Sequence, residues 1–513
     1  MSWMDIELNL LILLPAFSAP IILLLDRINK KLRKIYVIAS AVLSLYFIAA
    51  LFTANFAEIK TGDFFLQQSF DYLGGPFVIN FSLDNLSLFF SLLISTAVFL
   101  IIIYSTTYIK KNQTKYYALF FLVAASIQGS VLTADLFTMY LFIEGITVFT
   151  TPLISFKKTE ETTKAAMQYL YYGIIGGVFF FISIILIYFH LGTLKIAETA
   201  ARFSEIPGQM QLVIIIFFLL SLIIKLGIFP IHFWLPRAHS ACPAPVSALL
   251  SGVLLKVYLY IFMRIFWTMI SFDYLIELHI NTFIMDLALV SSLFGHIFAL
   301  QEDNFKKMLA YSSIGHIGMI LAVLMLNNQA AFYGAMLHIA AHLMMKSGLF
   351  LSSGYLLRSA KSHHIDELGG IGHKNRITFG AFVIICLGTI GMPPLLGFVS
   401  KWYILLAFLA AEHYFAALVT VLGSLIALFY YLRYISKAYT EVSPKLNTES
   451  WANDFSELLH LLKDDHLLSA VVYVFTLLII FFGFSFQYFD MPINTAIIEL
   501  LNPQKYIDLV LGG

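Results

Sequence analysis

The chain has 513 residues, of which 60% are hydrophobic and 12% are charged, and its mean hydropathy is +0.86. A soluble globular protein has about 45–50% apolar and about 25% charged residues, so this composition argues against that class and indicates a protein that crosses a membrane many times. The net charge of +1 gives no reason to expect nucleic-acid binding. The two cysteines, Cys242 and Cys386, are too few for a four-cysteine zinc or iron–sulfur site.

The predicted elements are membrane helices from the N-terminal region onward. The acidic start MSWMDIE lacks a basic region, so residues 8–25 are expected to form a first membrane helix and not a cleavable signal peptide. A membrane helix needs about 20 mostly apolar residues, and on this criterion the sequence predicts an all-α polytopic membrane protein with about 14 transmembrane helices. The expected segments are 8–25, 35–55, 83–108, 116–133, 135–156, 164–190, 211–229, 244–268, 280–299, 307–326, 330–357, 377–410 with an internal break, 413–438 and 466–489.

The loops between these segments differ in positive charge. Of the 31 Lys and Arg residues, 22 lie in one set of alternating loops and five lie in the other set, namely Lys60, Lys195, Arg202, Arg264 and Lys505. Cytoplasmic loops carry an excess of Lys and Arg. The richer set is therefore expected in the cytoplasm, and both termini are expected on the outer side of the cell inner (plasma) membrane.

Four lysines remain, and they lie at membrane depth: Lys225, Lys256, Lys346 and Lys401. Glu144, within LFIEGIT, is an acid in mid-segment. A charge at the bilayer centre costs roughly 2.5–3.5 kcal/mol on insertion scales. These groups are therefore expected to pair, to lose their charge, or to meet water inside the bundle.

Two segments contain residues that interrupt helices. KLGIFPIHFWLP places Pro230 shortly after Lys225, and GTIGMPPLLGFVSKW places Pro393 and Pro394 before Lys401. Interrupted helices at membrane depth, here five helices apart, point to an inverted-repeat transporter with broken seventh and twelfth helices. The expected units are an N-terminal three-helix segment at 1–113, two inverted five-helix repeats at 114–270 and 271–440, and a loop and C-terminal helix at 441–513.

The segment HIAAHLMMKSGLF places His338, His342 and Lys346 at i, i+4 and i+8, on one face of a helix. Histidine suits a proton relay because its unperturbed pKa is about 6.5. A metal site is disfavoured, since no HExxH pattern and no third ligand is evident. The other alternative for these histidines, and for His316 in SIGHIGMI, is an interhelical hydrogen bond of about 0.6 kcal/mol. With Lys346 on the same face, a proton relay is favoured.

Several motifs occur in an order that resembles the antiporter-like subunits of proton-translocating complexes. They are FSLDNLSLFF, LFIEGIT, KLGIFPIHFWLPRAHSACPAPVSALLSGVLLK, DNFKKMLAYSSIGHIGMI, HIAAHLMMKSGLF and MPPLLGFVSKW. This superfamily comprises the large proton-pumping subunits of respiratory complex I, the A and D subunits of Mrp sodium/proton antiporters, and related subunits of membrane-bound hydrogenases. The resemblance covers roughly residues 80–440.

The resemblance implies a role for each matched residue. Glu144 resembles the fifth-helix glutamate that pairs with the seventh-helix lysine, here Lys225. The other implied members of a polar, hydrated axis with half-channels to each side are the eighth-helix Lys256, the eleventh-helix His338, His342 and Lys346, and the twelfth-helix Lys401. Arg237 departs from the family, because many members carry an acid there. The short chain after the fourteenth helix is similar to that of the shorter complex I subunits or the Mrp D subunit.

Some of these residues also have a plain structural interpretation. Lys225 and Lys401 lie beside the breaks, where an amine also caps freed carbonyl groups. Asp84 and Asp135 fit ordinary helix caps. These alternatives stay open at the level of sequence.

A Glu–Lys pair that forms and breaks can act as a proton switch, because desolvation lowers the pKa of a lysine and a nearby carboxylate raises it. Candidates for proton access are His232, His239 and His316. No Walker A pattern, no GxGxxG after a strand and no CxxC is present. We therefore expect no catalytic site, metal or cofactor in this chain, and expect the energy to come from a partner.

These observations lead to three functional hypotheses. The first is a proton-translocating subunit of a redox-driven complex of the NADH:quinone oxidoreductase (NADH dehydrogenase) or related hydrogenase type. The alternative is a D-type subunit of an Mrp sodium/proton antiporter without redox chemistry, and the third is a non-pumping scaffold. The expected partners are other membrane subunits of a hetero-oligomeric complex, the lipid bilayer, and protons or sodium ions, with no nucleic acid.

Overall fold

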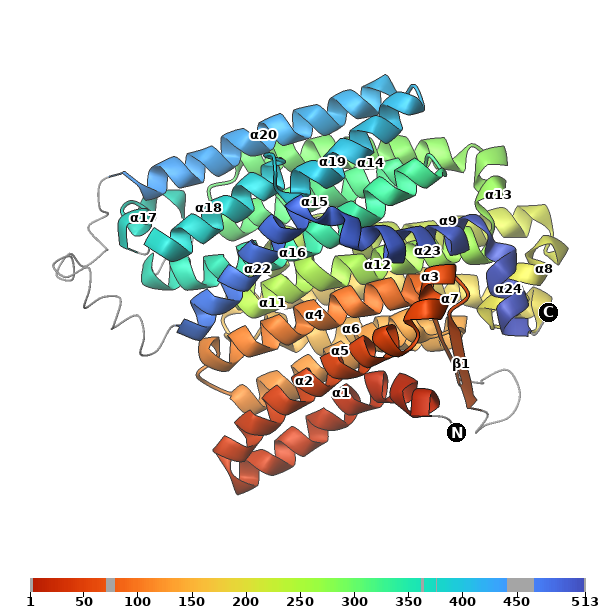
Figure 1. The fold of residues 1–513 in the computed structure, drawn as a ribbon, viewed down its shortest axis with the longest axis horizontal. Coiled ribbons are helices and arrows are strands. Elements are labelled where there is room, and N and C mark those ends of the chain that lie inside the picture. Colours follow the sequence, from red (N-terminus) through yellow and green to blue (C-terminus); the bar gives the residue numbers. More distant parts are fainter. Residues whose placement is uncertain (1–2, 71–78, 361–363, 375, 441–465, 512–513) are drawn as a thin grey trace.

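The computed structural model describes residues 3–70, 79–360, 364–374, 376–440 and 466–511, and in this part of the chain long helices run side by side (Figure 1). Thirteen of the described helical segments are long and apolar enough to cross a membrane. This confirms the prediction of an all-α polytopic membrane protein. The long helices are α1 (Trp3–Ile28), α2 (Lys30–Ala54), α4 (Asn85–Tyr108), α5 (Gln113–Leu132), α6 (Leu136–Ile154), α7 (Glu160–Leu191), α9 (Gly208–Leu226), α14 (Ile280–Gln301), α15 (Phe305–Leu324), α16 (Gln329–Ala360), α20 (Tyr414–Ala438), α22 (His466–Phe484) and the continuous run α11 (Ala244–Ala248), η2 (Leu249–Leu254), α12 (Leu255–Met263) and η3 (Arg264–Met269).

The remaining predicted segment consists of two shorter apolar helices, α18 (Arg376–Ile390) and α19 (Leu396–Ala410), and the break lies between them. The seventh segment is also interrupted, since α9 ends at Leu226 and α10 (Trp234–Ala241) begins after a turn. At both breaks a glycine adopts a left-handed conformation, with φ 66° at Gly227 and 99° at Gly391. Glycine tolerates this conformation because it has no Cβ atom. Both predicted breaks are confirmed, and the inverted repeat stays a prediction.

The short elements lie mostly at the end of the bundle that carries both chain ends. In this group, β1 pairs antiparallel with β2, with Phe65 opposite Asp84. The length criterion for membrane helices missed these elements, because each has at most 12 residues. They are α3 (Phe56–Thr61), β1 (Phe65–Phe70), β2 (Ile79–Asp84), α8 (Ile196–Arg202), η1 (Phe203–Glu205), α13 (Phe272–Glu277), η4 (Ile365–Glu367), α17 (Ile371–Lys374), η6 (Phe486–Phe489), α23 (Asp490–Leu501) and α24 (Pro503–Leu511).

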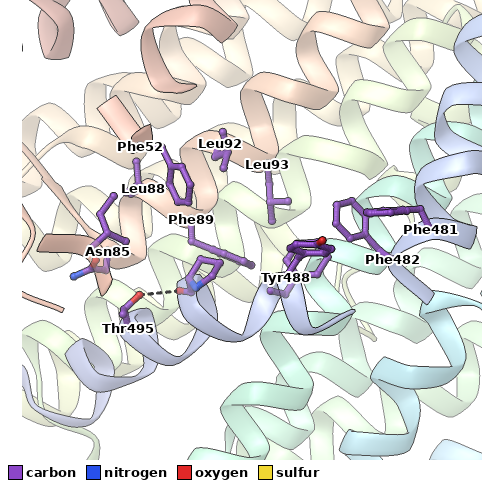
Figure 2. Close-up of a pocket in the computed structure, with 13 residues that line it drawn as sticks. Phe52, Asn85, Leu88, Phe89, Leu92, Leu93, Phe481, Phe482, Tyr488 and Thr495 are labelled. Carbon is purple, nitrogen blue, oxygen red and sulfur yellow. Dashed lines mark hydrogen bonds between the residues drawn. The ribbon is translucent and has the colours of Figure 1, made fainter. Parts of the chain in front are cut away.

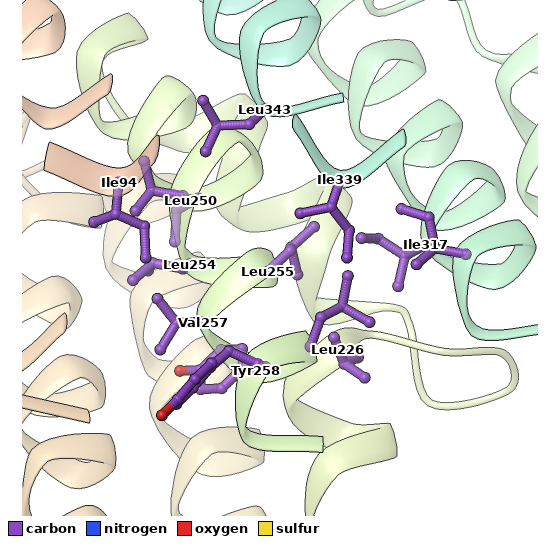
Figure 3. Packing of buried hydrophobic residues seen from close by; sticks show 14 of the residues in the cluster. Ile94, Leu226, Leu250, Leu254, Leu255, Val257, Tyr258, Ile317, Ile339 and Leu343 are labelled. Carbon is purple, nitrogen blue, oxygen red and sulfur yellow. The ribbon is translucent and has the colours of Figure 1, made fainter. Parts of the chain in front are cut away.

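Two helical segments form the centre of the bundle. The apolar windows of 244–269 and of α16 are buried along their whole length, whereas only 28% of that of α2 and 39% of that of α7 are buried. Figure 3 shows Leu255 on the side of Ile317 of α15 and Ile339 of α16, and Val257 on the opposite side, near Leu254; all of them belong to one buried apolar cluster. Lys256 lies between Leu255 and Val257 in the sequence, so the apolar core encloses the segment that carries it.

The first turn of α1 and the end of α24 lie at the same end of the bundle, and α17 lies at the opposite end (Figure 1). This agrees with an even number of crossings. Three of the loop lysines that support the predicted orientation, Lys361, Lys445 and Lys463, lie outside the described residues. The placement of Arg264 in a loop is wrong, because it begins η3, is 2% exposed and forms an ion pair with Asp84.

Candidate functional site

Glu144 of α6 and Lys225 of α9 form the ion pair that the resemblance implies. The distance from Lys225 Nζ to Glu144 Oε1 is 3.2 Å, and the side chains are 2% exposed for Lys225 and 21% exposed for Glu144. Lys225 Nζ also donates to the carbonyl oxygen of Gly173, at 3.2 Å, and to Thr147 Oγ1, at 3.4 Å. The Gly173 carbonyl belongs to helix α7, so capping of the break is not the contact that Lys225 makes here.

The glycines of α7 make room for this pair. A Cβ atom at Gly177 would lie 2.2 Å from Glu144 Oε1, and one at Gly176 would lie 3.3 Å from Lys225 Cγ. On the other side, Lys225 Nζ lies 5.9 Å from the centre of the Tyr258 ring, where a cation is attracted to the aromatic face. The segment FSLDNLSLFF and the rest of α4 take no part in these contacts.

Lys256 of α12 and His342 of α16 form the second contact of the predicted set. Lys256 Nζ lies 2.7 Å from His342 Nδ1 and donates to the carbonyl oxygen of Ser251 at 2.6 Å. Both side chains are fully buried. Ser251 lies in the π-helical turn η2, whose wider hydrogen-bonding pattern leaves this carbonyl within reach of the amine.

The histidines gather where α15 meets α16. His316 Nδ1 lies 3.1 Å from His338 Nε2, and His338 Nδ1 lies 2.8 Å from Ser400 Oγ of α19. The ring centres of His316 and His342 are 5.0 Å apart, so the cluster continues the contact between His342 and Lys256. The polar groups therefore run from Lys256 through three histidines to Ser400, which precedes Lys401 in the sequence.

Lys346 and Lys401 lie at the two edges of this cluster. Lys346 donates to Ser312 Oγ and, at 3.1 Å, to the carbonyl oxygen of Leu309. Lys401 Nζ donates to the carbonyl oxygens of Thr389 and Ile390, at 2.9 and 3.0 Å, and to Ser424 Oγ at 2.9 Å. Lys401 therefore caps the end of α18, as its plain structural interpretation predicts, while it also borders the polar cluster.

The sequence-predicted residues fall into two groups. Glu144 and Lys225 form one, and the cluster from Lys256 to Lys401 forms the other; the described residues provide no hydrogen bond or ion pair between them. Tyr258 lies between the two groups. Lys225 Nζ lies over its ring, and Tyr258 follows Lys256 by two positions in the sequence. Among the four lysines at membrane depth, and within the described ranges, an ion pair is found only at Lys225.

His232 and His239 are buried outside both groups. His232 stacks on Phe229 and Phe298, with ring centres 5.5 and 5.6 Å away, and His239 stacks on Phe350 at 4.5 Å. Neither nitrogen of His239 has a hydrogen-bond partner among the described residues. The structure therefore separates these two proton-access candidates from His316, which joins the histidine cluster.

The sequence analysis missed His296 of α14. Its Nδ1 lies 3.3 Å from Tyr430 Oη, and its ring centre lies 5.4 Å from that of His316. A Cβ atom at Gly315 or Gly423 would approach the imidazole to 2.7 or 2.8 Å, so two glycines provide its space. The signal in the sequence is a histidine after glycine inside an apolar segment, LFGHIF, and His316 in SIGHIGMI has the same local sequence.

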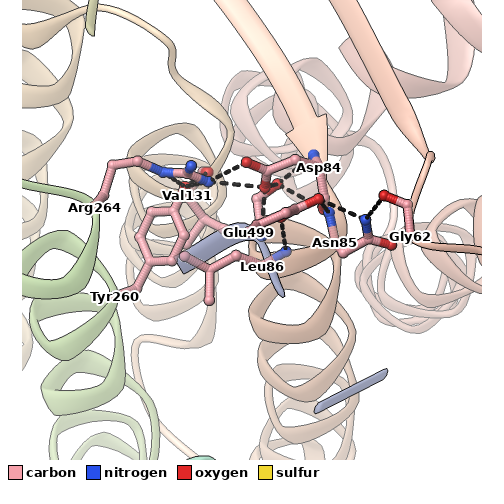
Figure 4. Close-up of polar contacts among 9 residues, drawn as sticks. Gly62, Asp84, Asn85, Leu86, Val131, Tyr260, Arg264 and Glu499 are labelled. Carbon is pink, nitrogen blue, oxygen red and sulfur yellow. Dashed lines mark hydrogen bonds and ion pairs between the residues drawn. The ribbon is translucent and has the colours of Figure 1, made fainter. Parts of the chain in front are cut away.

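The helix caps predicted for Asp135 and Asp84 are present. Asp135 accepts a hydrogen bond from the backbone N–H of Thr138 at 2.7 Å, and Asp84 accepts one from Ser87 at 2.8 Å. Asp84 has a further contact that the sequence analysis did not foresee, since Arg264 Nη2 lies 2.7 Å from its Oδ2 (Figure 4). Arg237, the loop residue that departs from the family, is exposed and donates to Gln168.

The described residues contain no group of three or more His, Cys, Asp or Glu side chains placed to hold a metal ion. An apolar pocket of about 390 Å³ lies between α4 and the α22–α23 region (Figure 2). Phe89 and Phe482 are among its lining side chains, and none of the predicted axis residues lines it. The chemistry that the axis itself supports is proton transfer between amines, imidazoles, hydroxyls and one carboxylate.

Comparison with known proteins gives family matches over most of this region. Residues 133–427 match the family model for the transmembrane part of NADH:quinone oxidoreductases and Mrp antiporters. Residues 74–121 match the model for the N-terminus of chain 5 of NADH-ubiquinone oxidoreductase (complex I). The first match includes every predicted axis residue.

Curated relatives carry two kinds of name. The N subunit of NADH-quinone oxidoreductase from Desulforudis audaxviator is 31% identical over 444 residues, covering 85% of this chain and 87% of the relative. The D subunit of the Na(+)/H(+) antiporter from Alkalihalophilus pseudofirmus is 30% identical over 404 residues, covering 78% and 79%. The D subunit of the Bacillus subtilis antiporter is 28% identical and covers 98% of both chains.

Two solved structures share the fold over nearly the whole chain. A chain of the Mrp complex from Dietzia sp. superposes with a TM-score of 0.86 at 22% identity, covering 100% of both chains. A chain of the membrane-bound sulfane sulfur reductase, an archaeal respiratory membrane complex, superposes with a TM-score of 0.85 at 25% identity, covering 98% and 99%. The fold is therefore shared by antiporter and respiratory assemblies.

Proposed function

The chain belongs to the NADH:quinone oxidoreductase/Mrp antiporter family of antiporter-like membrane subunits, and from this premise we propose that it moves protons along its buried Glu–Lys–His axis as part of a redox-driven complex. The complex is of the NADH:quinone oxidoreductase or related hydrogenase type. Other membrane subunits supply the redox chemistry, and this chain supplies the proton path. It sits in the inner (plasma) membrane with both termini on the outer side.

The observation that carries this proposal is the buried row of groups from Lys256 through His342, His316 and His338 to Ser400. Its hydrogen-bonded steps are 2.7, 3.1 and 2.8 Å, and the His316 and His342 rings lie 5.0 Å apart, centre to centre. Polar groups in a membrane interior are costly, and in pumps and transporters such rows serve as proton relays. A scaffold alone would gain nothing from keeping them there.

The pair Glu144–Lys225 is the switch in this proposal. While the carboxylate lies 3.2 Å from the amine, the lysine keeps its proton. Movement of Glu144 away from Lys225 frees that proton for Lys256 and the histidines, with Tyr258 lying at the junction. The energy for this movement comes from a redox reaction in a neighbouring protein of the complex. Of the three candidates for proton access, His316 lies within the relay itself, and His232 and His239 lie outside it.

The second candidate function is sodium/proton exchange without redox chemistry. It is favoured by the similarity to the D subunit of the Bacillus subtilis antiporter, which extends over 98% of both chains. In that case a sodium gradient, and not a redox reaction, moves the Glu144–Lys225 pair. The proton path through the chain is the same.

Proton pumping by the whole complex in sealed vesicles tests this function, with Lys256→Ala compared with the wild type. A pH-sensitive dye reports acidification while NADH, reduced ferredoxin or a sodium gradient is supplied in turn. Lys164→Ala is the matched control, because Lys164 is 75% exposed and forms a surface ion pair with Glu160, four residues away. We expect the wild type and the control to pump with a redox donor, and Lys256→Ala to lose pumping.

Each other outcome has a defined meaning. A pH change that only sodium drives, and that Lys256→Ala abolishes, would favour the antiporter function. Normal pumping by Lys256→Ala with every energy source would contradict the relay and restore the scaffold hypothesis. Normal pumping by Glu144→Gln would contradict the switch alone.

A further inference from the structure

A buried ionic cluster lies at the end of the bundle that carries both chain ends, apart from the axis. Asp84 at the end of β2, Arg264 at the start of η3 and Glu499 in α23 are 1%, 2% and 4% exposed. Figure 4 shows the three side chains converging on the first turn of α4. The fold therefore places two carboxyl groups and one guanidinium where almost no surface is accessible.

The guanidinium of Arg264 is committed to Asp84. Its Nη2 lies 2.8 Å from Asp84 Oδ1 and 2.7 Å from Oδ2. Its Nε and Nη2 also donate to Tyr260 Oη, at 3.2 and 3.0 Å, and its Cζ lies 4.9 Å from the centre of the Tyr506 ring. One positive charge is thus balanced by one negative charge.

Glu499 is held by dipoles and not by a cation. Its Oε1 accepts hydrogen bonds from the backbone N–H and the side-chain amide of Asn85, at 3.0 and 2.5 Å, and its Oε2 accepts one from the N–H of Leu86 at 3.0 Å. No ion pair of Glu499 is found in the part of the chain that the structure describes. Its carboxyl group is the second acid at the start of α4, next to Asp84.

A negative charge on Glu499 would therefore be a second, uncompensated charge in a buried place. The two tyrosines of this cluster, Tyr260 and Tyr506, are neutral phenols at ordinary pH. Lys505 lies at the solvent edge and is paired with Asp63, at 2.9 Å. Burial and a nearby like charge both disfavour ionisation of a carboxylic acid.

We propose that Glu499 is a further proton-binding site of this protein, which takes up and releases one proton at this end of the bundle. In the release step the carboxylic acid becomes a carboxylate, and the proton passes to the solution at the Lys505–Asp63 edge. The Asp84–Arg264 ion pair takes no part in this step. The step involves one proton and no change of covalent partner.

Two further observations support this site. Burial, first, and the charge of Asp84, second, raise the pKa of Glu499 from 4.5 to about 8, against the hydrogen bonds from Asn85 and Leu86, which lower it. Helix α23 has 12 residues and is not among the described helices that are long and apolar enough to cross a membrane. At its other end α23 contacts the helices of the axis, since Tyr333 of α16 donates a hydrogen bond to Asp490. The Tyr333 ring packs edge-on against that of Tyr403 of α19, at 4.8 Å.

Helix α23 thus joins the helices that carry His338 and Lys401 to the Glu499 site. If the proposed function holds, Glu499 is a proton-release group for that axis, and this part of the inference rests on that function. The binding of a proton to Glu499 does not depend on transport. The two parts can therefore be tested separately.

Infrared difference spectroscopy of the assembled complex tests the proton site. In the wild type we expect the carbonyl band of a protonated carboxylic acid, which disappears as the pH rises through about 8. Glu499→Gln should remove this band. Glu205→Gln should leave it unchanged, because Glu205 is an exposed acid paired with Arg202. The proposal would be overturned if the wild-type complex showed no carboxylic-acid band, or if Glu499→Gln left the band in place.

The pH dependence of stability gives a second test with a definite sign. The pKa of Glu499 is higher in the folded protein, about 8, than its ordinary value of 4.5. Its contribution to stability is therefore fully present below pH 4.5 and is lost as the pH rises through about 8. Thermal unfolding should show the wild type losing stability relative to Glu499→Gln across this window. Equal pH profiles for the two proteins would contradict the site.

Proton pumping separates the site from the proposed function. A complex that shows the band but does not pump would leave the site standing and refute the proposed function. A Glu499→Gln complex that pumps like the wild type, although the band is lost, would refute the role of Glu499 in release. If the Glu499→Gln complex does not assemble, Glu499→Asp replaces it. The proposal would be overturned if the carbonyl band of Glu499→Asp disappeared at the same pH as that of the wild type.

Discussion

Gly177 has no side chain, and the Glu144 carboxylate occupies the space that a side chain would fill. A Cβ atom there would lie 2.2 Å from Glu144 Oε1 and 2.7 Å from Cδ. The group that must move is the end of a flexible side chain, so the clash is relieved at little cost in stability. The consequence falls on the Glu144–Lys225 contact, which depends on that position of the carboxylate.

We therefore predict that Gly177→Ala lowers the rate of proton transport by at least about tenfold, because displacement of a reacting group by about 1 Å can lower a rate by more than that. The complex should still unfold at nearly the wild-type temperature. Vesicle acidification and thermal unfolding measure the two quantities. Gly380→Ala is the matched control, since its Cβ atom would meet no atom within 4 Å. Unchanged transport by Gly177→Ala would mean that the position of Glu144 is not critical.

His296 and His316 are two buried histidines with the same local sequence. Both follow a glycine in an apolar helix, and both are buried, yet only His316 was singled out by its sequence. In space both have partners on other helices: His316 contacts His338, and His296 contacts Tyr430 and lies 5.4 Å from His316, ring centre to ring centre. The partners of a histidine on an apolar helix come from neighbouring helices, so its own sequence does not show them.

The break between α18 and α19 places Lys401 between the end of α18 and the histidine cluster. The last carbonyl groups of α18 lack partners within the helix, and Lys401 supplies donors to two of them. Buried carbonyl groups left without a partner cost about 1–3 kcal/mol. The same amine borders the histidine cluster, next to Ser400. If the proposed function holds, this one side chain serves both stability and transport.

Two substitutions should separate these roles. Lys401→Met removes both the donor and the charge, and it should lower stability by about 1–3 kcal/mol and abolish transport. Lys401→Gln keeps an amide donor, so it should recover part of the stability but none of the transport. Thermal unfolding and vesicle acidification are the measurements, with Lys437→Met on the exposed end of α20 as the control. Wild-type transport by Lys401→Gln would show that the role is capping alone.

In the part of the chain that the structure describes, the first turn of α1 and the end of α24 lie at the same end of the bundle, so both have to lie on the same side of the membrane (Figure 1). Lys164 lies at the end of the bundle with the richer loops, and Arg202 lies at the end with the chain termini. Both native cysteines are fully buried. An introduced surface cysteine can therefore be labelled against a low background.

We predict that a membrane-impermeant thiol reagent labels Arg202→Cys from outside intact cells and Lys164→Cys only from the cytoplasmic side. The physical reason is the excess of Lys and Arg in the loops on the Lys164 side. Both side chains are at least 45% exposed and belong to surface ion pairs of little energetic value, so the substitutions should be tolerated. The reverse labelling pattern would contradict the predicted orientation.

The sequence by itself determined the membrane helices, the two breaks and the candidate members of the axis. Apolar runs of about 20 residues have one stable state in a bilayer, and Gly or Pro at membrane depth interrupts a helix, so both features can be read locally. Lysines in apolar segments were recognised by the cost of burying a charge. The motif order then indicated which of them belong together.

Only the tertiary structure decided which polar groups meet. Glu499 and Asn85 are 414 positions apart, and nothing local indicates that a short C-terminal helix brings an acid to the first turn of α4. Arg264 was assigned to a loop because it lies near the end of its segment, and its pairing with Asp84 depends on the β1–β2 hairpin and on η3. Contacts between distant segments follow from packing. A buried charge is stable only when the folded chain places a partner next to it, and that partner can come from any part of the sequence.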